Sequence, residues 1–96
     1  MIIYVDIDDT IAYSPDAPDY STSIPIKKNI EKINLLYDDN HIIVYWTARG
    51  TKTGKQWFNT TLHQLQSWGC KFHELRMGKP YYDMLICDKT KRIEEI

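Results

Sequence analysis

The chain has 96 residues, of which 43% are hydrophobic and 26% are charged, and its formal net charge is −1 at pH 7. This apolar content suits one hydrophobic core, so we predict a single domain over residues 1–96. The near-neutral charge argues against a protein that holds nucleic acid by general electrostatic attraction, because that mode of binding needs an excess of Lys and Arg.

The N-terminal residues and the cysteines argue against two further classes. The apolar run Met1–Val5 gives way to acids at Asp6, so it is neither a signal peptide with a basic start nor a membrane-spanning helix. We therefore expect a cytoplasmic protein without a membrane partner. Cys70 and Cys87 lack the spacing of metal-binding cysteines, which argues against a zinc site or a disulfide framework.

The first part of the chain predicts a strand, a loop and a helix. Residues 1–5 form an apolar run rich in β-branched side chains that stops at acids, as a strand buried on both faces does. Residues 12–23 hold prolines, aspartates and hydroxyl side chains without periodicity, which indicates a long loop of a kind that is often functional. Residues 26–37 carry apolar side chains at helical spacing and predict an amphipathic helix.

The second part repeats this alternation. Residues 41–46 are another apolar, aromatic run and predict a strand. Residues 54–68 have large apolar side chains at steps of three and four, which predicts a helix with one core-facing stripe. A short strand is expected at residues 71–75. The run Met84–Cys87 predicts a last buried strand that meets Asp88.

This order of elements predicts an α/β fold, in detail a three-layer Rossmann-like sandwich with a short, mainly parallel sheet. In such sheets, ligands bind beyond the carboxyl ends of the strands. Each strong predicted strand ends in reactive polar residues, and we expect these residues to converge at one edge. They are Asp6, Asp8 and Thr10 after the first strand, Thr47 and Arg49 after the second, and Asp88 after the last.

Clustered carboxylates at one edge need a cation. Asp6, Asp8 and Asp88 repel one another unless a proton or a divalent ion neutralises them, and a cluster of oxygen ligands suits Mg²⁺. Because Mg²⁺ in proteins commonly binds substrate phosphates as well, a phosphate ester is the expected ligand. Lys79 would balance the negative charge, and the Thr47 hydroxyl would donate a hydrogen bond to a phosphoryl oxygen.

Plainer interpretations stay open for single residues. An Asp-x-Asp after a strand is usually part of a turn or a helix cap. Lys79 lies in a Gly-Lys-Pro turn, where a solvated side chain is common, and Arg49 is as good a candidate for a surface residue as for a substrate contact. The hypothesis rests on the combination, in which Thr10 completes the first motif and Thr47, Lys79 and Asp88 follow later in the chain.

The motif Val5-Asp-Ile-Asp-Asp-Thr-Ile11 resembles the first signature of the haloacid-dehalogenase superfamily, an apolar strand followed by Asp-x-Asp-x-Thr. The stretch Ile42–Thr47 resembles the second motif, Lys79 the third and Tyr82–Lys89 the acidic fourth, so the similarity covers nearly the whole chain. More narrowly, the Tyr-Trp-Thr-Ala-Arg-Gly and His-Glu-Leu-Arg-Met-Gly-Lys-Pro stretches are similar to small phosphatases of capsule or lipopolysaccharide biosynthesis.

The resemblance implies a phosphatase in which Asp6 attacks the phosphoryl group and forms a phosphoaspartate. Asp8 would protonate the leaving oxygen and then activate water. The resemblance also implies Mg²⁺ held by the Asp6 carboxylate, the Asp8 main-chain carbonyl and an acid of the fourth motif, here Asp88. That motif often ends in paired acids, and Cys87 stands in place of the first of them in this chain.

The expected substrate is a sugar phosphate or a related small metabolite. The chain leaves no room for the cap domain that encloses small substrates in many relatives, so the site should be open, and a second subunit of a homo-oligomer is a candidate cover. An open site also suits a polynucleotide end or another macromolecular phosphate. The Cys87 difference keeps open a degenerate domain that binds phosphorylated ligands without turnover. A signalling receiver domain gathers similar residues, but it places its acceptor Asp where this chain has Thr47.

Overall fold

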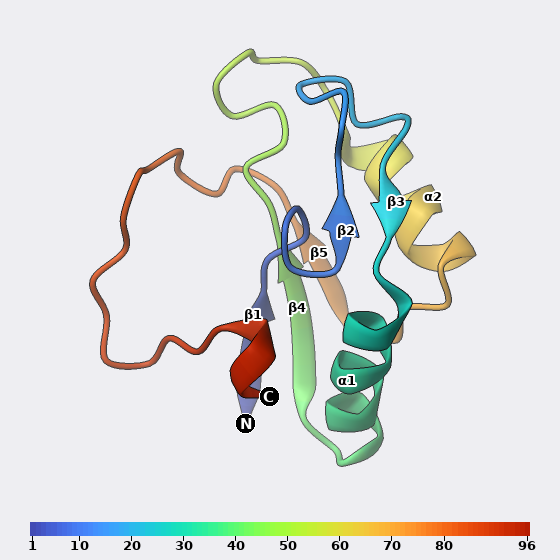
Figure 1. The fold of residues 1–96 in the computed structure, drawn as a ribbon, viewed down its shortest axis with the longest axis vertical. Coiled ribbons are helices and arrows are strands. Elements are labelled where there is room, and N and C mark those ends of the chain that lie inside the picture. The colour runs from blue at the N-terminus through green and yellow to red at the C-terminus, as the bar shows by residue number, and fades with distance from the viewer.

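The computed structural model describes all residues from Met1 to Ile96, and they form a small α/β fold. The central sheet consists of three parallel strands, ordered β1 (Ile2–Val5), β4 (Ile42–Trp46) and β5 (Glu74–Arg76) (Figure 1). A two-stranded antiparallel ribbon of β2 (Ala12–Tyr13) and β3 (Ile24–Pro25) follows β1. The predicted α/β class with a short, mainly parallel sheet is confirmed.

Two helices connect the strands. Helix α1 (Lys27–Asp38) joins β3 to β4, and helix α2 (Phe58–Ser67) joins β4 to β5. The first matches the predicted helix, whereas the second begins later than predicted because the chain still runs as a loop through Gly54, whose φ is +76°. A single-turn 3₁₀ helix, η1 (Ile93–Glu95), ends the chain. No helix is both long enough and apolar enough to cross a membrane.

The core lies on one face of the sheet. In register, Ile3 pairs with Ile43 and Val5 with Tyr45, so these side chains share a face. Both helices supply side chains to the same core, which also includes the first residues after β1. Its buried members are Val5, Ile7, Ile11, Ala12, Ile30, Ile33, Ile43, Tyr45 and Leu65.

The opposite side of β1 is open. The side chains of Ile2, Tyr4 and Ile42 alternate away from the core, and they are 67%, 46% and 44% exposed. Since β1 is the first strand in the sheet order, its outer edge has no neighbouring strand. We call the exposed side chains of Ile2, Tyr4 and Ile42 the apolar margin of the sheet. The unpaired edge of β1 lies beside this margin.

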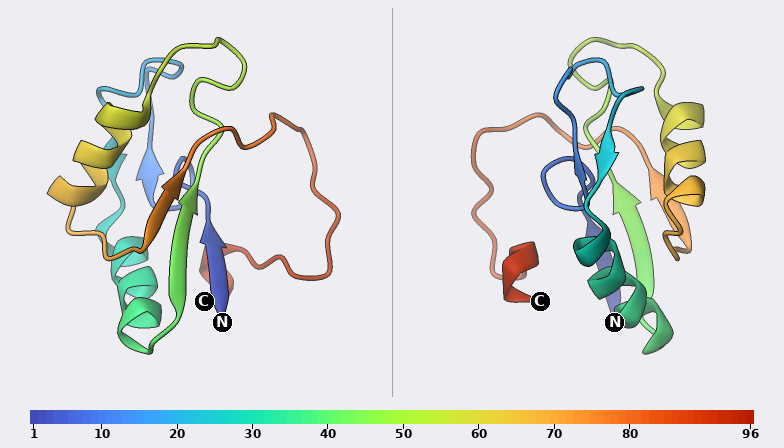
Figure 2. Two further views of the ribbon diagram at one scale, coloured as in Figure 1. Left: turned by 180° about the vertical axis from the view of Figure 1, so that it is seen from behind. Right: turned by 45° about the vertical axis from the view of Figure 1, so that its right-hand side comes forward.

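The predicted strand Met84–Cys87 is not formed, and this prediction was wrong. Every residue from Pro80 to Arg92 is exposed, and we call this segment, residues 80–92, the arm. Figures 1 and 2 show it as an orange-red arch that stands clear of the sheet before it returns to η1. Only residues 77–83 separate β5 from the predicted strand, whereas a parallel crossover needs about a dozen residues or more. The connection is too short for that strand to join its own sheet in parallel.

Candidate active site

The first two acids lie at the carboxyl end of β1. Because successive side chains of a strand alternate, Asp6 and Asp8 point away from the buried Val5 and Ile7. A tight turn follows, in which Asp9 has a φ of +64° and the amides of residues 10–12 all donate to the carbonyl oxygen of Ile7 at 2.8 to 3.2 Å. The turn takes the chain out of the sheet and leaves both carboxylates at its edge.

Asp6 faces Lys79 across this edge. The Lys79 Nζ lies 3.4 Å from Asp6 Oδ1, and the Asp6 side chain is still 41% exposed, so its carboxylate is accessible to a ligand. Burial of its surroundings raises the pKa of Asp6 above the ordinary value, and the positive charge of Lys79 offsets part of that rise. The Lys79 ammonium also lies over the rings of Trp46 and Tyr82, at 5.7 and 5.5 Å from their centroids.

Thr47 connects the second strand end to this pair. It is 1% exposed, and its amide donates to the carbonyl of Arg76 on β5 at 3.0 Å. The Thr47 carbonyl accepts from the amide of Lys79 at 3.0 Å, which fixes the turn that carries the lysine. Its hydroxyl oxygen accepts from the amide of Arg49 at 3.1 Å. The structure thus brings together the ends of β1 and β4 and the turn after β5.

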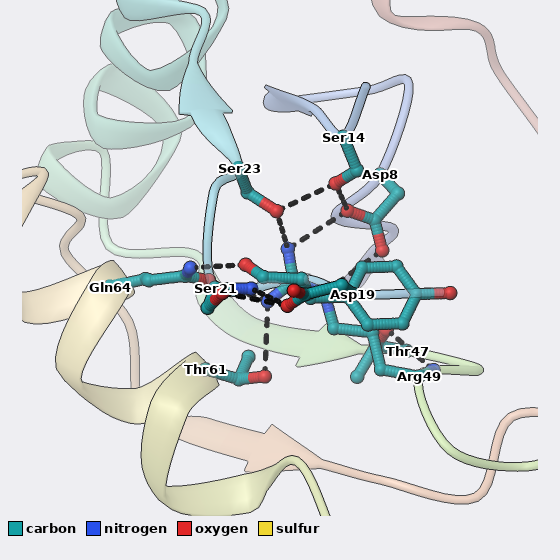
Figure 3. Close-up of polar contacts among 10 residues, drawn as sticks. Asp8, Ser14, Asp19, Ser21, Ser23, Thr47, Arg49, Thr61 and Gln64 are labelled. Carbon is teal, nitrogen blue, oxygen red and sulfur yellow. Dashed lines mark hydrogen bonds and ion pairs between the residues drawn. The ribbon is translucent and has the colours of Figure 1, made fainter. Parts of the chain in front are cut away.

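Asp8 is bound differently, by a buried arginine. Arg49 Nε donates to Asp8 Oδ2 at 2.9 Å and Nη2 donates to Asp8 Oδ1 at 2.8 Å, a two-point contact shown in Figure 3. The Arg49 side chain has no exposed surface, whereas that of Asp8 is 24% exposed. The Ser14 hydroxyl also donates to Asp8 Oδ1 at 2.7 Å. Both carboxylate oxygens of Asp8 are therefore occupied.

The same guanidinium reaches helix α2 and the loop before β3. Its Nη1 donates to Thr61 Oγ1 at 3.1 Å and to Gln64 Oε1 at 2.6 Å. Its Nη2 also donates to Ser23 Oγ at 3.2 Å, and its Cζ atom lies over the Tyr20 ring, 4.8 Å from the ring centroid. Arg49 thus links Asp8, the loop and α2 into one buried network.

Sequence reasoning missed the residues around Arg49. It placed Arg49 at the strand end but not its contacts beyond Asp8, which come from Tyr20, Ser23, Thr61 and Gln64. It also missed Ser14, which bonds Asp8. A signal was present in α2, where Thr61 belongs to the stripe predicted to face the core and Gln64 follows it by three residues, about one helical turn. A polar side chain on a buried stripe needs a polar partner.

The remaining predicted site residues lie apart from this network. Thr10 is partly buried, its hydroxyl makes no hydrogen bond, and its carbonyl accepts from Asn29 Nδ2 at 2.8 Å. Asp88 is exposed in the arm, next to Cys87. No group of three or more potential metal-binding side chains forms in the chain, so Asp88 does not join Asp6 and Asp8 here.

The donors at this edge fit a hard cation in part. The Asp6 carboxylate is accessible, and the main-chain carbonyl of Asp8 accepts no hydrogen bond, so two oxygen ligands are free. The carboxylate oxygens of Asp8 are taken by Arg49 and Ser14. A third ligand, from a second carboxylate, is missing from the set that one chain offers.

Two shallow cavities lie among the neighbouring loops. One, of about 230 Å³, is formed by residues 49–51, 54–57 and 77–78, between the ends of β4 and β5. Gly50 has a φ of +82°, and a Cβ there would collide with the carbonyl of Lys55, so only glycine fits at this wall. The other, of about 280 Å³, lies between the loop carrying Asp16 and the turn at Thr53. Neither cavity is lined by Asp6 or Lys79, but the first includes Arg49 and Gly78, the residue before Lys79. The first is the cavity closer to the predicted chemistry.

Comparison with known proteins finds a shared fold but no family. No protein-family model matches the chain, and no curated protein matches it. Among solved structures, the chain is similar to a structural-genomics target protein from Vibrio cholerae, with 23% identity and a TM-score of 0.87. The match covers 99% of this chain and 86% of that one. At this level of identity, the likeness shows that the two proteins share a fold.

Proposed function

We propose that the chain is a Mg²⁺-dependent phosphomonoester hydrolase that works through a phosphoaspartate on Asp6, with a sugar phosphate or related small metabolite as substrate. The observation that carries the proposal is the contrast between two neighbouring acids. Asp6 is accessible and paired with a single lysine, as a nucleophile requires, whereas Asp8 is held by a buried arginine. The resemblance of the four motifs supports the same assignment.

In the first half-reaction, a carboxylate oxygen of Asp6 bonds to phosphorus as the bond from phosphorus to the leaving oxygen breaks. Lys79, already 3.4 Å from Asp6, offsets the negative charge that gathers on the phosphoryl oxygens. Asp8, in its protonated form, gives its proton to the leaving oxygen and becomes the carboxylate that serves as base in the second half-reaction. To do so, Asp8 has to give up at least one of its contacts with Arg49 and Ser14.

In the second half-reaction, Asp8 takes a proton from water as the water oxygen attacks phosphorus and releases Asp6. The products are the alcohol and inorganic phosphate, and the enzyme returns to its initial state. The Asp6 carboxylate and the Asp8 main-chain carbonyl would hold Mg²⁺, whose charge would offset the negative charge of the phosphate. The predicted contact of Thr10 with substrate and the three-layer form of the sandwich remain part of the proposal, as do a cytoplasmic location and a role in capsule biosynthesis. A contact of Arg49 with substrate would require its side chain, which has no exposed surface, to leave some of its partners.

A second candidate function follows from the state of Asp8. With both of its oxygens occupied, the site matches a domain that binds phosphorylated ligands through Lys79 without turning them over. Such a domain would retain ligand binding in a variant that lacks the nucleophile. The two candidates therefore differ in turnover, not in binding.

The test is steady-state phosphate release from an aryl phosphate and from a panel of sugar phosphates, with Mg²⁺ and with excess chelator. The parent should turn over with Mg²⁺ and stop in chelator, and Asp6→Asn should lose essentially all activity because an amide cannot form the acyl phosphate. Asp9→Asn is the matched control, since Asp9 is an exposed acid of the same strand end and Asn tolerates its positive φ. More than a few per cent of the parental rate in Asp6→Asn sinks the assignment, and phosphate binding by a parent without turnover establishes the second candidate.

A further inference from the structure

The arm and the apolar margin beside β1 both expose apolar side chains, and both have backbone groups without a strand partner. In the arm, the side chains of Met84, Leu85 and Ile86 are 76%, 53% and 90% exposed. No residue from Asp83 to Lys91 makes a hydrogen bond or ion pair with a residue outside the arm. On the margin, the outer edge of β1 lacks a strand partner, and Ile2 and Tyr4 are exposed beside it. An apolar segment with free backbone groups and a free strand edge suit one another.

We propose that the arm of one copy adds as a strand to the β1 edge of a second copy, and that its Asp88 completes the active site of that second copy. The part concerning Asp88 rests on the proposed function. A parallel register that sets Asp88 level with Asp6 sets Ile86 level with Tyr4, on the exposed side of the strand. The Asp88 carboxylate then lies at the carboxyl edge, where one chain alone lacks a third ligand.

The chain's own arm cannot make this arrangement. Parallel addition to its own β1 would require residues 77–83 to cross the sheet and return to the amino end of the strands, which is shorter than such crossovers are. An antiparallel return avoids that limit, but it carries Asp88 to the amino end of β1, away from Asp6. A second copy has neither restriction, because its orientation is free.

The anchoring of the arm permits the exchange without unfolding. At one end, the amide of Lys79 donates to the carbonyl of Thr47 at 3.0 Å. At the other, Ile93 packs against the core and its carbonyl accepts from Lys32 Nζ at 3.3 Å. Between these anchors, a folded-back segment of this length extends up to about 20 Å, enough to reach a neighbouring chain. The structural match to the Vibrio cholerae protein spans 99% of the chain and therefore includes the arm.

A crosslinking experiment tests the strand addition without any assay of activity. Tyr4→Cys and Ile86→Cys are combined with Cys70→Ser and Cys87→Ser, and the full chain is oxidised and run on a non-reducing gel. Arm exchange predicts a covalent dimer. The control moves the first cysteine to Leu35, a 67% exposed side chain of α1, the helix that packs on the core face of the sheet and not on the exposed face of β1, and this variant should stay monomeric. A disulfide within one chain, or no disulfide at Tyr4→Cys, overturns the proposal.

A complementation experiment tests the contribution of Asp88. Asp6→Asn and Asp88→Asn should each be inactive alone. Mixed and allowed to exchange, they should recover about a quarter of the parental rate, because half of the dimers are mixed and each of those holds one intact site. A mixture that stays inactive while the parent turns over overturns the shared site. If the parent itself has no phosphatase activity, the proposed function fails, and the crosslink still decides whether the arm is exchanged.

Discussion

Two irregular segments leave the sheet. One is fixed by contacts along its length, whereas the other is held only at its ends. Residues 14–23, between β2 and β3, are mainly polar and without periodicity, yet Ser14, Tyr20 and Ser23 are held by contacts with Asp8 and Arg49. The arm contains the apolar run Met84–Cys87 and is held only at its ends. A buried charge that needs partners can fix a loop with no pattern of its own. An apolar run needs an available neighbour, and here none lies within its own chain.

The largest effect on stability should come from removing the partner of the buried charge. Asp8→Ala leaves the fully buried Arg49 without its carboxylate, and breaking such a pair costs about 3–5 kcal/mol of unfolding free energy. Asp83→Ala, an exposed acid at the start of the arm, should change stability by less than about 0.5 kcal/mol. Urea unfolding of both variants makes the measurement, and equal costs would mean that the network does not hold the loop.

The next effect concerns turnover. Asp8→Asn should slow both half-reactions by about a hundredfold or more, as loss of a general acid and base does. A good leaving group should rescue the first half only, because the attack of water still needs the base. Rates for aryl and alkyl phosphates, measured where the variant is folded, give the comparison. Undiminished rates for both substrates would rule out this role for Asp8.

Tyr45 differs from Arg49, because its buried polar group has no hydrogen-bond partner. The Tyr45 hydroxyl makes no hydrogen bond within the core, and its burial raises the pKa of Tyr45 well above the ordinary value. Tyr45→Phe removes this unsatisfied group and should leave stability unchanged or raise it by up to about 1 kcal/mol. Thermal unfolding at neutral pH is the measurement. A loss of stability would show that the hydroxyl has a partner, and Cys70, whose thiol pKa is raised by burial to about 11, is the nearest candidate.

The smallest effect distinguishes Asp6 from Asp8. Because the pKa of Asp6 is raised in the fold, its ionisation costs stability above that pKa, and the cost is absent below the ordinary pKa of an aspartate, about 3.9. Asp6→Asn should therefore stabilise the fold at neutral pH by less than about 1 kcal/mol, since a half-exposed charge is screened. The gain should vanish near pH 3. Melting curves at both pH values decide, and destabilisation at neutral pH would contradict the assigned environment of Asp6.

Much of the fold followed from local patterns. The strands at residues 1–5 and 41–46 and the helix at 26–37 were predictable because each apolar period ends at polar residues. The strand at Met84–Cys87 was not, because its pattern says nothing about whether the connection before it can reach the sheet. The local sequence indicates which side chains a segment can bury. The length of the connection before the segment decides which strand it can pair with.

The candidate site divides in the same way. The meeting of Asp6, Thr47 and Lys79 follows from one rule, that parallel strands end at a common edge. The binding of Asp8 by Arg49 does not, because the partners of Arg49 come from a loop and from a helix whose paths depend on the finished fold. Whether these residues catalyse phosphate transfer remains a prediction.

The most direct measurement of the central claim is capture of the covalent intermediate. Parent and Asp8→Asn proteins are mixed with an aryl phosphate and Mg²⁺, quenched in acid, digested and analysed by mass spectrometry. The account predicts one added phosphoryl group on the peptide from the end of β1, located at Asp6, and more of it in Asp8→Asn because hydrolysis of the intermediate is slowed. Turnover by the parent with no phosphoryl group on Asp6, or with the group on another residue, would contradict it.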